Sequence, residues 1–343
     1  MLNVVDSGEW LTSVRGMGPA PAVAAVRAAV RTAVRDLAPG DLVLVACSGG
    51  ADSLALAAAT AFEVPRAGLR AGAVTVDHGL QPGSPDRAAL VARQLGELGL
   101  DPVEIATVDV GRHGGPEAAA RAARYGALAA MADRLGAATV LLGHTRDDQA
   151  ETVLLGLARG SGGRAMAGMR RAFDGYRRPL LDVSRADTVT ACQVEGLEVW
   201  EDPHNSDPAF TRSRVRQRVL PLLEEELGPG VADALARTAE QLRPDMELLD
   251  LQAEEALAGC VVEGGLAVDR LSALPSPIRT RVVRLAALAA GSPAGDLFHQ
   301  HVVAIDALVT DWHGQGPLDL PGARVGRVSG KLLVNPPSRD RQE

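Results

Sequence analysis

The feature that most restricts the fold of this sequence is a regular alternation of two kinds of segment between residues 41 and 158. Short apolar runs, rich in β-branched residues, have the composition of buried parallel strands and lie at 41–47, 71–79, 101–110 and 138–144. Segments with helical spacing of their apolar residues follow at 53–62, 84–99, 116–136 and 147–158. The alternation predicts an α/β fold with a Rossmann-like, doubly wound, mostly parallel sheet and helices on both faces.

The pattern changes after residue 158, and the change suggests a second domain. Glycine-rich and polar loops come first, and helical spacing dominates from about residue 229 to 310. The last segment alternates like short strands. We expect a flexible tail over 1–18, a catalytic domain over 19–224 and a smaller, mainly helical domain with short terminal strands over 229–335.

Polar motifs follow three of the predicted strands. They are SGGADS after the first strand, DHG at the end of the second and GHTRDD at the end of the fourth. Ligands of open parallel sheets bind outside the carboxyl ends of the strands. The sequence therefore predicts a binding site at this edge of the sheet.

The first of these motifs has the properties of a phosphate-binding loop. It consists of Ser48, Gly49, Gly50, Ala51, Asp52 and Ser53. Its glycines let the backbone approach a phosphate, and the N-terminus of the following helix offers free N–H groups. The hydroxyls of Ser48 and Ser53 can donate further hydrogen bonds. Asp52 would repel a bare phosphate, so its presence favours Mg²⁺ beside the phosphates. The alternative interpretation is an ordinary helix N-cap turn.

Composition excludes several other chemistries. Of the 35 basic residues only one is lysine, Lys331, so the phosphate loop has no Walker-type lysine and the main fold has no lysine nucleophile. The three cysteines are far apart and form no metal-binding motif, and aromatic residues make up only 3%, too few for a stacking platform for nucleic acid. The sequence has no signal peptide and no run long enough to span a membrane, and we expect a cytoplasmic protein.

The fourth strand leads into a group of candidate site residues. Asp148 and Glu151 are three residues apart, so both carboxylates lie on one face of the first helical turn. Such a pair can hold a cation, either Mg²⁺ or an amino group, although acidic residues are also common at helix starts. His144 follows the strand directly and is a candidate donor to a phosphate or a transition state, while a structural histidine is the alternative.

The motifs together carry a family resemblance. SGGADS resembles the signature of the PP-loop ATP pyrophosphatases, which bind ATP without a Walker lysine. Further motifs follow in order: VDHGL (76–80), EAAARAARYGAL (117–128), GHTRDDQAET (143–152), RGSGG (159–163), RPLL (178–181), EDPHN (201–205) and RSRVRQRVLPLL (212–223). The set is similar to that of the tRNA(Ile)-lysidine synthases, densely from about residue 40 to 225 and more loosely beyond.

This resemblance implies a reaction and roles for individual residues. The expected reaction joins L-lysine to C2 of the wobble cytidine, position 34, of tRNA(Ile) with a CAU anticodon. It passes through an adenylated cytidine and releases AMP and pyrophosphate. Ser48–Ser53 would bind ATP·Mg²⁺ with Asp52 and Asp148 as metal ligands, and Asp148 and Glu151 would contact lysine or Mg²⁺. His144, Arg124 and Arg216 complete the expected catalytic set.

The charge distribution is compatible with an RNA partner. The chain has a net charge of −8, yet residues 159–218 contain eleven arginines against eight acidic residues. Basic charge is therefore concentrated beside the predicted site, and arginine is the better bidentate ligand for phosphate. A solvated surface is the alternative, and we expect no membrane association and no obligate protein partner.

The sequence departs from the family pattern at two points, and three rival functions are considered beside the family's own. Gln81 stands where the family often has arginine, and longer members carry a further C-terminal domain, so the helical domain is expected to dock the tRNA. The nearest rival is a PP-loop tRNA 2-thiolation enzyme, which would want cysteines near the site. The other two rivals are a small-molecule PP-loop synthetase and a non-catalytic RNA-binding protein. A non-catalytic protein would be expected to have lost Asp52 or the Asp148/Glu151 pair.

Overall fold

The chain forms two compact units. The computed structural model describes residues 18–79, 83–108, 116–160, 162–200 and 207–336. Unit 1 comprises the described residues up to Glu151 together with Met169–Ala236, and unit 2 comprises Thr152–Gly168 and the residues from Arg237 onward. The chain passes between the units after Glu151, after Gly168 and after Ala236. The last of these points lies inside a helix whose first turn forms an Arg146–Asp233 ion pair of 2.7 Å within unit 1. The domain limits 19–224 and 229–335 stay a prediction.

Unit 1 is built from alternating helices and strands, as expected. In chain order they are α1 (Pro21–Val34), β1 (Leu42–Ala46), α2 (Ala51–Arg66), β2 (Arg70–Asp77), α3 (Ser84–Glu97), β3 (Val103–Thr107), α4 (Pro116–Leu135), β4 (Ala137–Leu142), α5 (Arg146–Ala158), β5 (Ala172–Phe173), β6 (Tyr176–Arg177), a 3₁₀ turn (Pro179–Asp182), α7 (Arg185–Val194), α8 (Thr211–Arg214), a π-helical turn (Val215–Val219) and α9 (Leu220–Leu227). Helices α5 and α10 (Val231–Cys260) each contribute to both units. The last residues of α5 belong to unit 2, and the first residues of α10 belong to unit 1.

The sheet of unit 1 has the order β3-β2-β1-β4-β6-β5. All neighbours are parallel except β5 and β6. The chain moves outward from β1 to β2 and β3, and then returns to place β4 on the other side of β1. This reversal makes the carboxyl ends of β1 and β4 the switch point of the sheet, where α/β folds bind ligands. The predicted doubly wound fold is confirmed.

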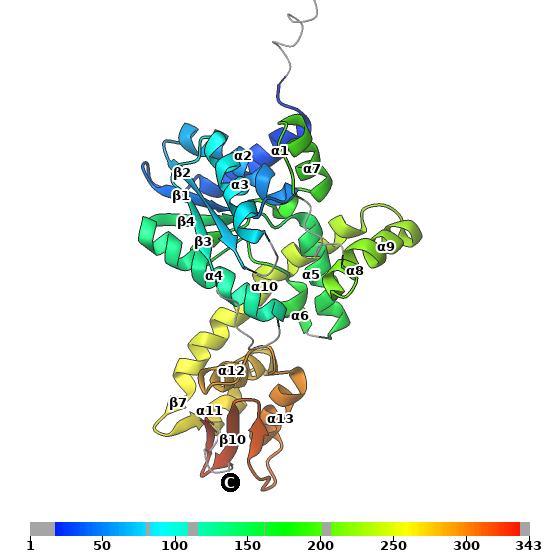
Figure 1. Cartoon of the computed structure of the whole chain (residues 1–343). Helices are drawn as coiled ribbons and strands as arrows, with labels where there is room; N and C mark the ends of the chain where they lie inside the picture. The colour runs from blue at the N-terminus through cyan, green and yellow to red at the C-terminus, as the bar shows by residue number, and fades with distance from the viewer. Residues whose placement is uncertain (1–17, 80–82, 109–115, 161, 201–206, 337–343) are drawn as a thin grey trace, which may run out of the picture. The chain divides into compact units, whose positions relative to one another are not determined.

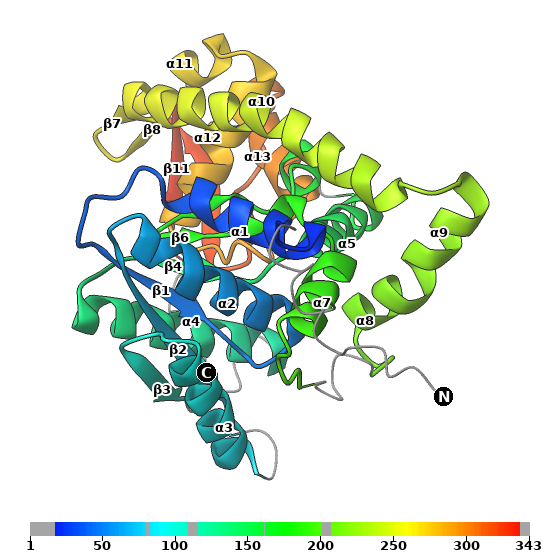
Figure 2. The same cartoon turned by 90° about the horizontal axis from the view of Figure 1, so that it is seen from above.

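Both faces of the sheet are covered, which explains the continuous apolar character of β1. Val43 and Val45 belong to the core that β1 shares with α1, α2, α3 and α7, and Leu42 and Leu44 belong to a second core that includes Leu128 of α4. Helices α1 and α2 lie side by side over the first face, and α4 lies on the other (Figures 1 and 2). Side chains of a strand alternate between its two faces, so a strand buried on both faces needs apolar residues throughout.

A close contact between β2 and the segment before β3 provides a test of this packing. A Cβ atom added to Gly72 would lie 2.8 Å from the carbonyl oxygen of Pro102 and 2.9 Å from Cδ2 of Leu44. Gly72→Ala is therefore expected to lower the free energy of unfolding by about 1–3 kcal/mol. Gly126→Ala is the control, because Gly126 is exposed in α4 with no atom within 4 Å of the added Cβ, and it is expected to stabilise by about 0.5–1 kcal/mol. Equal urea midpoints for the two variants would contradict the packing.

Unit 2 combines helices with an antiparallel sheet. Its further elements are α6 (Gly162–Met166), β7 (Val261–Val262), β8 (Gly265–Ala267), α11 (Val268–Ala273), α12 (Ser276–Ala289), α13 (His299–Thr310), β9 (Leu318–Leu320), β10 (Ala323–Val328) and β11 (Lys331–Asn335). The sheet order is β7-β8-β11-β10-β9, and Val325 and Leu332 of the sheet pack with Val282 and Ile305 of the helices. Helices α10, α12 and α13 and the terminal strands were predicted, whereas α6 lies in a segment predicted to be a glycine-rich loop and α11 was not predicted. The β7–β8 hairpin was not predicted either, because its strands have only two and three residues.

Two further predictions meet the described part of the chain differently. Among the described residues, no helix has the length and apolar character that crossing a membrane would require. The predicted tail lies almost wholly in residues 1–17, which are outside the described residues.

Candidate active site

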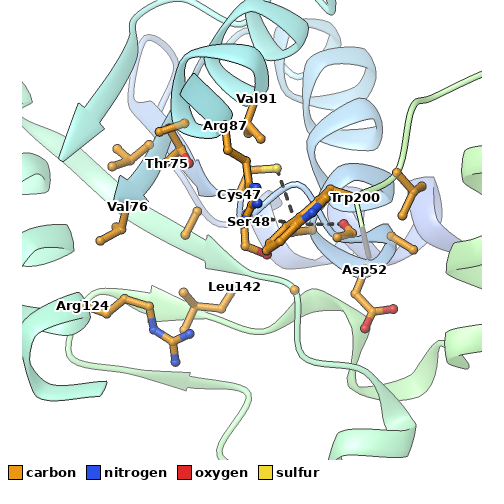
Figure 3. A pocket seen from close by; sticks show the side chains of 18 of the residues that line it. Cys47, Ser48, Asp52, Thr75, Val76, Arg87, Val91, Arg124, Leu142 and Trp200 are labelled. Carbon is orange, nitrogen blue, oxygen red and sulfur yellow. Dashed lines mark hydrogen bonds between the residues drawn. The ribbon is translucent and has the colours of Figure 1, made fainter. Parts of the chain in front are cut away.

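The motifs predicted to form a site meet at one edge of the sheet of unit 1. Ala46 at the end of β1 is paired in register with Leu142 of β4 and Val74 of β2, so the segments that follow β1 and β4 start side by side. A cavity of about 1090 Å³ opens there (Figure 3). Most of the predicted site residues line it: Ser48, Gly50, Ala51, Asp52, Ser53, Arg124, His144, Asp148 and Arg216. Gly49 and Glu151 are the two that do not.

The phosphate loop owes its shape to Gly49 and Ser53. Gly49 has a φ of +86°, and a Cβ atom at this position would lie 2.8 Å from Cγ2 of Val91, so only glycine fits. The hydroxyl of Ser53 is buried; it accepts a hydrogen bond from the backbone N–H of Ser48 (3.1 Å) and donates one to the carbonyl of Gly50 (2.9 Å). Ser53 therefore braces the loop, while Ser48 is exposed in the cavity.

Asp52 stands in the first turn of α2 and is held by two residues of α7. Nε of Arg185 donates to its Oδ2 at 3.1 Å, and the hydroxyl of Thr188 donates to its Oδ1 at 2.5 Å. Burial raises the pKa of the Asp52 carboxyl, and the guanidinium of Arg185 and the Thr188 hydroxyl oppose that rise. Asp52 is thus a partly buried carboxylate that is paired with the guanidinium of Arg185.

Asp148 caps α5 and faces the cavity. Its Oδ2 accepts hydrogen bonds from the backbone N–H (2.8 Å) and the hydroxyl (3.1 Å) of Thr145, the residue before the helix. Its Oδ1 accepts from Arg185 at 2.9 Å and from Arg216 at 3.1 Å. Burial would raise the pKa of this carboxyl, but Arg185, the Thr145 N–H, His144 and Arg216 outweigh it and lower the pKa to about 2. Asp148 is therefore ionised throughout the neutral range.

Glu151 lies behind the cavity wall rather than in it. Its carboxylate is fully buried and accepts hydrogen bonds from Nε of Arg212 (3.1 Å) and from Nε of Arg216 (2.6 Å), with Arg185 at 3.5 Å. Arg212 and Arg216 are four residues apart, in α8 and in the π-helical turn that follows it. The sequence predicts that Glu151 contacts lysine or Mg²⁺; in the structure its carboxylate holds arginines, because its side chain extends into the space between α5 and these turns.

Histidine and arginine line the part of the cavity next to β4. His144 is neutral: burial lowers its pKa to about 3, against the attraction of Asp148. Its Nδ1 is buried without a hydrogen-bond partner among the described residues, as is Nδ1 of His78. Arg124 of α4 also lines the cavity, and burial lowers the pKa of its guanidinium. A neutral imidazole beside a phosphate loop can donate a hydrogen bond without adding charge.

The cavity is also lined by apolar and aromatic side chains. Val74, Val76, Val91 and Leu197 line it, and Trp200 extends over the phosphate loop beside Ser48 (Figure 3). The backbone N–H of Trp200 donates to the carbonyl of Gly49 at 2.9 Å. The guanidinium of Arg87 lies 3.6 Å from the centre of the indole ring. The cavity thus combines charged side chains, which suit phosphates and amines, with apolar side chains and one large aromatic face.

Sequence reasoning missed Arg185, Thr188, Arg87 and Trp200. Arg185 follows the recognised RPLL motif by only four residues, but nothing local marks it, because its partners are 34 to 133 residues away along the chain. Trp200 could have been found, since a lone tryptophan beside a polar loop is unusual in a chain with three tryptophans. Among the described residues that line the cavity, the cationic side chains are all arginines: Arg87, Arg124, Arg185 and Arg216.

The donor atoms are suited to Mg²⁺ only in combination with a ligand. Among the described residues, no three His, Cys, Asp or Glu side chains are grouped so as to hold a metal ion. Asp52 and Asp148 nevertheless both line the cavity beside the phosphate loop, and Arg185 bonds to both carboxylates. Mg²⁺ is commonly held by one or two carboxylates together with substrate phosphates, and this pair fits that pattern.

Gln81, the EDPHN motif at 201–205 and Ser161 of the RGSGG motif lie outside the described residues.

Comparisons with known proteins agree with this geometry. Residues 24–223 match the PP-loop domain family, and residues 266–333 match the TilS substrate binding domain. The chain is 60% identical over 321 residues to a tRNA(Ile)-lysidine synthase of Thermobifida fusca, covering 93% of this chain and 99% of that protein. It is 56% identical to a tRNA(Ile)-lysidine synthase of Streptomyces coelicolor, again over 93% of this chain and 99% of the relative.

A solved structure supports the fold alone. It is the U34-tRNA thiolase NcsA from Methanococcus maripaludis with its [4Fe-4S] cluster, with a TM-score of 0.55 and 18% identity over 64% of this chain and 79% of that one.

Proposed function

The chain belongs to the tRNA(Ile)-lysidine synthase family, and we propose that it ligates free L-lysine to C2 of the wobble cytidine, position 34, of tRNA(Ile) with a CAU anticodon. It is an enzyme of tRNA modification that uses ATP, and the reaction would take place in the cytoplasm. The observation that carries this proposal is the identity to its relatives over nearly the whole chain, through both the PP-loop domain and the C-terminal domain.

The proposed reaction has two steps. The C2 oxygen of the cytidine attacks the α-phosphorus of ATP, the bond to the β-phosphate breaks and pyrophosphate leaves. The ε-nitrogen of lysine then attacks C2, the bond between C2 and oxygen breaks, and AMP leaves. Before this attack the lysine ammonium gives up one proton to solvent or to a base, and the nitrogen releases a second proton once its bond to C2 has formed.

The charged side chains of the cavity suit both steps. The phosphate loop and the N-terminus of α2 would bind the triphosphate through backbone N–H groups and Ser48. Neutral His144 and the arginines Arg124 and Arg216 would stabilise the charge that develops on the α-phosphate. Asp52 and Asp148 would hold Mg²⁺ together with the phosphates, and the ion would neutralise phosphate charge when bound.

Asp148 is also the proposed contact of the lysine ammonium. Its carboxylate is ionised and lines the cavity, whereas Glu151 is bonded to three arginines behind it. Glu151 would thus act indirectly, by fixing Arg185, Arg212 and Arg216 in place. Adenylation and lysine transfer would then share one site and require little movement between steps.

Thiolation is the less supported function. The three cysteines are all buried, and burial raises the pKa of Cys47 beside the phosphate loop and raises that of Cys192 to about 12. A thiolate is the reactive form in sulfur transfer, and these thiols are kept protonated.

The function is tested by incubating the enzyme with ATP, labelled lysine and tRNA(Ile) bearing a CAU anticodon, followed by nucleoside analysis. Label is expected in the RNA only with this tRNA, with one AMP and one pyrophosphate formed for each lysine incorporated. Formation of ADP, or turnover without RNA, would contradict the proposal.

Trp200 is expected to provide the stacking surface for the adenine ring. Stacking of a base on an aromatic side chain contributes about 1–3 kcal/mol, so Trp200→Ala should weaken ATP binding roughly tenfold or more, and Trp200→Phe should weaken it much less. Calorimetry without tRNA measures the effect. Trp312→Ala is the matched control, because Trp312 also lies near an arginine, Arg327, but in unit 2. An ATP affinity equal to that of the wild type in Trp200→Ala would refute this assignment.

A further inference from the structure

Arg185 is the residue that brings the carboxylates of the site together. It is the first residue of α7, and its backbone N–H donates to Oδ2 of Asp147 at 2.8 Å, so its position is fixed at the backbone as well as at the side chain. Nε bonds to Asp52 and the terminal nitrogens reach Asp148 and Glu151. Burial lowers the pKa of Arg185, but the three carboxylates raise it above its usual value.

The geometry of these contacts differs from that of an ordinary ion pair. Arginine binds a single carboxylate most strongly through two parallel hydrogen bonds. Arg185 instead directs each of its three nitrogens at a different carboxylate, at 3.1, 2.9 and 3.5 Å. Such an arrangement binds each carboxylate less strongly than a bidentate pair would, but it fixes the positions of the three carboxylates relative to one another.

The partners come from the two parts of the site that perform different steps. Asp52 belongs to the phosphate loop at the start of α2, and Asp148 belongs to the start of α5 beside the proposed lysine contact. The two carboxylates have the same charge and repel each other, and a cation bonded to both offsets this repulsion. Arg185, with a side chain only 23% exposed, is that cation.

We propose that Arg185 is a positioning residue that couples the phosphate-loop carboxylate Asp52 to Asp148, so that adenylation and lysine transfer occur at one geometry. This inference rests on the proposed function. Arg185 acts through the carboxylates and does not itself contact the reacting atoms. It follows that loss of Arg185 should slow both steps together, whereas loss of a residue that serves one substrate should slow one step.

The inference is tested with Arg185→Ala and Arg185→Gln, measured against Arg171→Ala. Arg171 is a matched control, since it forms an exposed ion pair with Asp182 in the same unit. Pyrophosphate release without lysine reports adenylation, and single-turnover transfer of labelled lysine to pre-adenylated tRNA reports the second step. Because a misplacement of about 1 Å can cost 10²-fold in rate, both Arg185 variants should slow both steps by about 10–100-fold. ATP affinity, measured by calorimetry, should change less than about threefold, since the loop backbone is intact.

Chemical rescue distinguishes positioning from a general loss of folding. Guanidinium ions at concentrations far below denaturing should raise the rate of Arg185→Ala at least about tenfold, because they replace the lost cation among the three carboxylates. Urea, which is neutral and of similar shape, should not restore it. Slowing of only one step, equal rescue by urea, or a loss of rate that follows a loss of thermal stability would overturn the inference. Lysidine formation by the wild-type enzyme in the same assay tests the proposed function separately.

Discussion

Replacing Asp148 with Asn is expected to lower kcat/KM for lysine by about 10²–10³-fold, the range found when one preorganised electrostatic contact is removed from an active site. The Asp148 carboxylate, with a pKa of about 2, is ionised at every pH at which the enzyme would work. It lines the cavity, unlike Glu151, and so is the anion of α5 that a substrate ammonium can reach. Asparagine removes the charge but keeps the size and the oxygen that accepts from Thr145.

The measurement is steady-state lysidine formation with varied lysine, together with pyrophosphate release in its absence. Adenylation should fall less than lysine transfer if the ammonium contact dominates the role of Asp148. Asp182→Asn is the control, because Asp182 is 72% exposed in its ion pair with Arg171. A variant Asp148→Asn that incorporates lysine at nearly the wild-type rate would rule out Asp148 as the lysine contact.

The second large effect concerns stability at low pH. His144 is buried with a pKa of about 3, well below its usual value of about 6.5. Between these two values the unfolded chain binds a proton that the folded protein does not, so stability falls as the pH falls through this window. From pH 7 to pH 4 the wild type should lose about 3 kcal/mol of unfolding free energy through this one residue.

His144→Gln isolates this contribution. Glutamine does not titrate, so the difference in stability between variant and wild type should shift in favour of the variant by about 3 kcal/mol on going from pH 7 to pH 4. The groups that face His144 are Asp148, which favours its protonation, and Arg178, Arg124 and Arg121, which oppose it. Urea unfolding at the two pH values measures the shift. Parallel losses in the two proteins would mean that His144 is solvated or paired in the folded state.

The parts of the fold and site that the sequence predicts are those set by local rules. The strand β1, the phosphate loop and α2 follow from an apolar run, two glycines and a helix start that are adjacent in sequence. The cap of α5 is equally local, since Thr145 and Asp148 are three residues apart. Parallel-strand topology then brings these two segments together, which is why most predicted site residues share one cavity.

The residues that could not be predicted depend on contacts between distant segments. Arg185 meets Asp52 across 133 residues, and whether an arginine at a helix start faces solvent or a carboxylate depends on where that helix packs. The burial of Glu151 has the same origin: its helix position was correctly read as sharing a face with Asp148, but the arginines of α8 and the π-helical turn cover it. Helical spacing determines which face of a helix a residue occupies, but it does not determine which segment packs against that face.

The absence of lysine from the cavity wall has a chemical consequence for an enzyme of this kind. In the proposed reaction the adenylated cytidine is an electrophile that any primary amine nearby could attack. Guanidinium groups stay protonated and are poor nucleophiles, so Arg87, Arg124 and Arg216 can neutralise phosphate, and Arg185 can balance carboxylate charge, without competing with the substrate. The single amine side chain, Lys331, belongs to the other unit, where its Nζ donates to the carbonyl of Glu263 at 2.8 Å. An all-arginine wall would thus protect the enzyme from covalent capture by its own activated RNA.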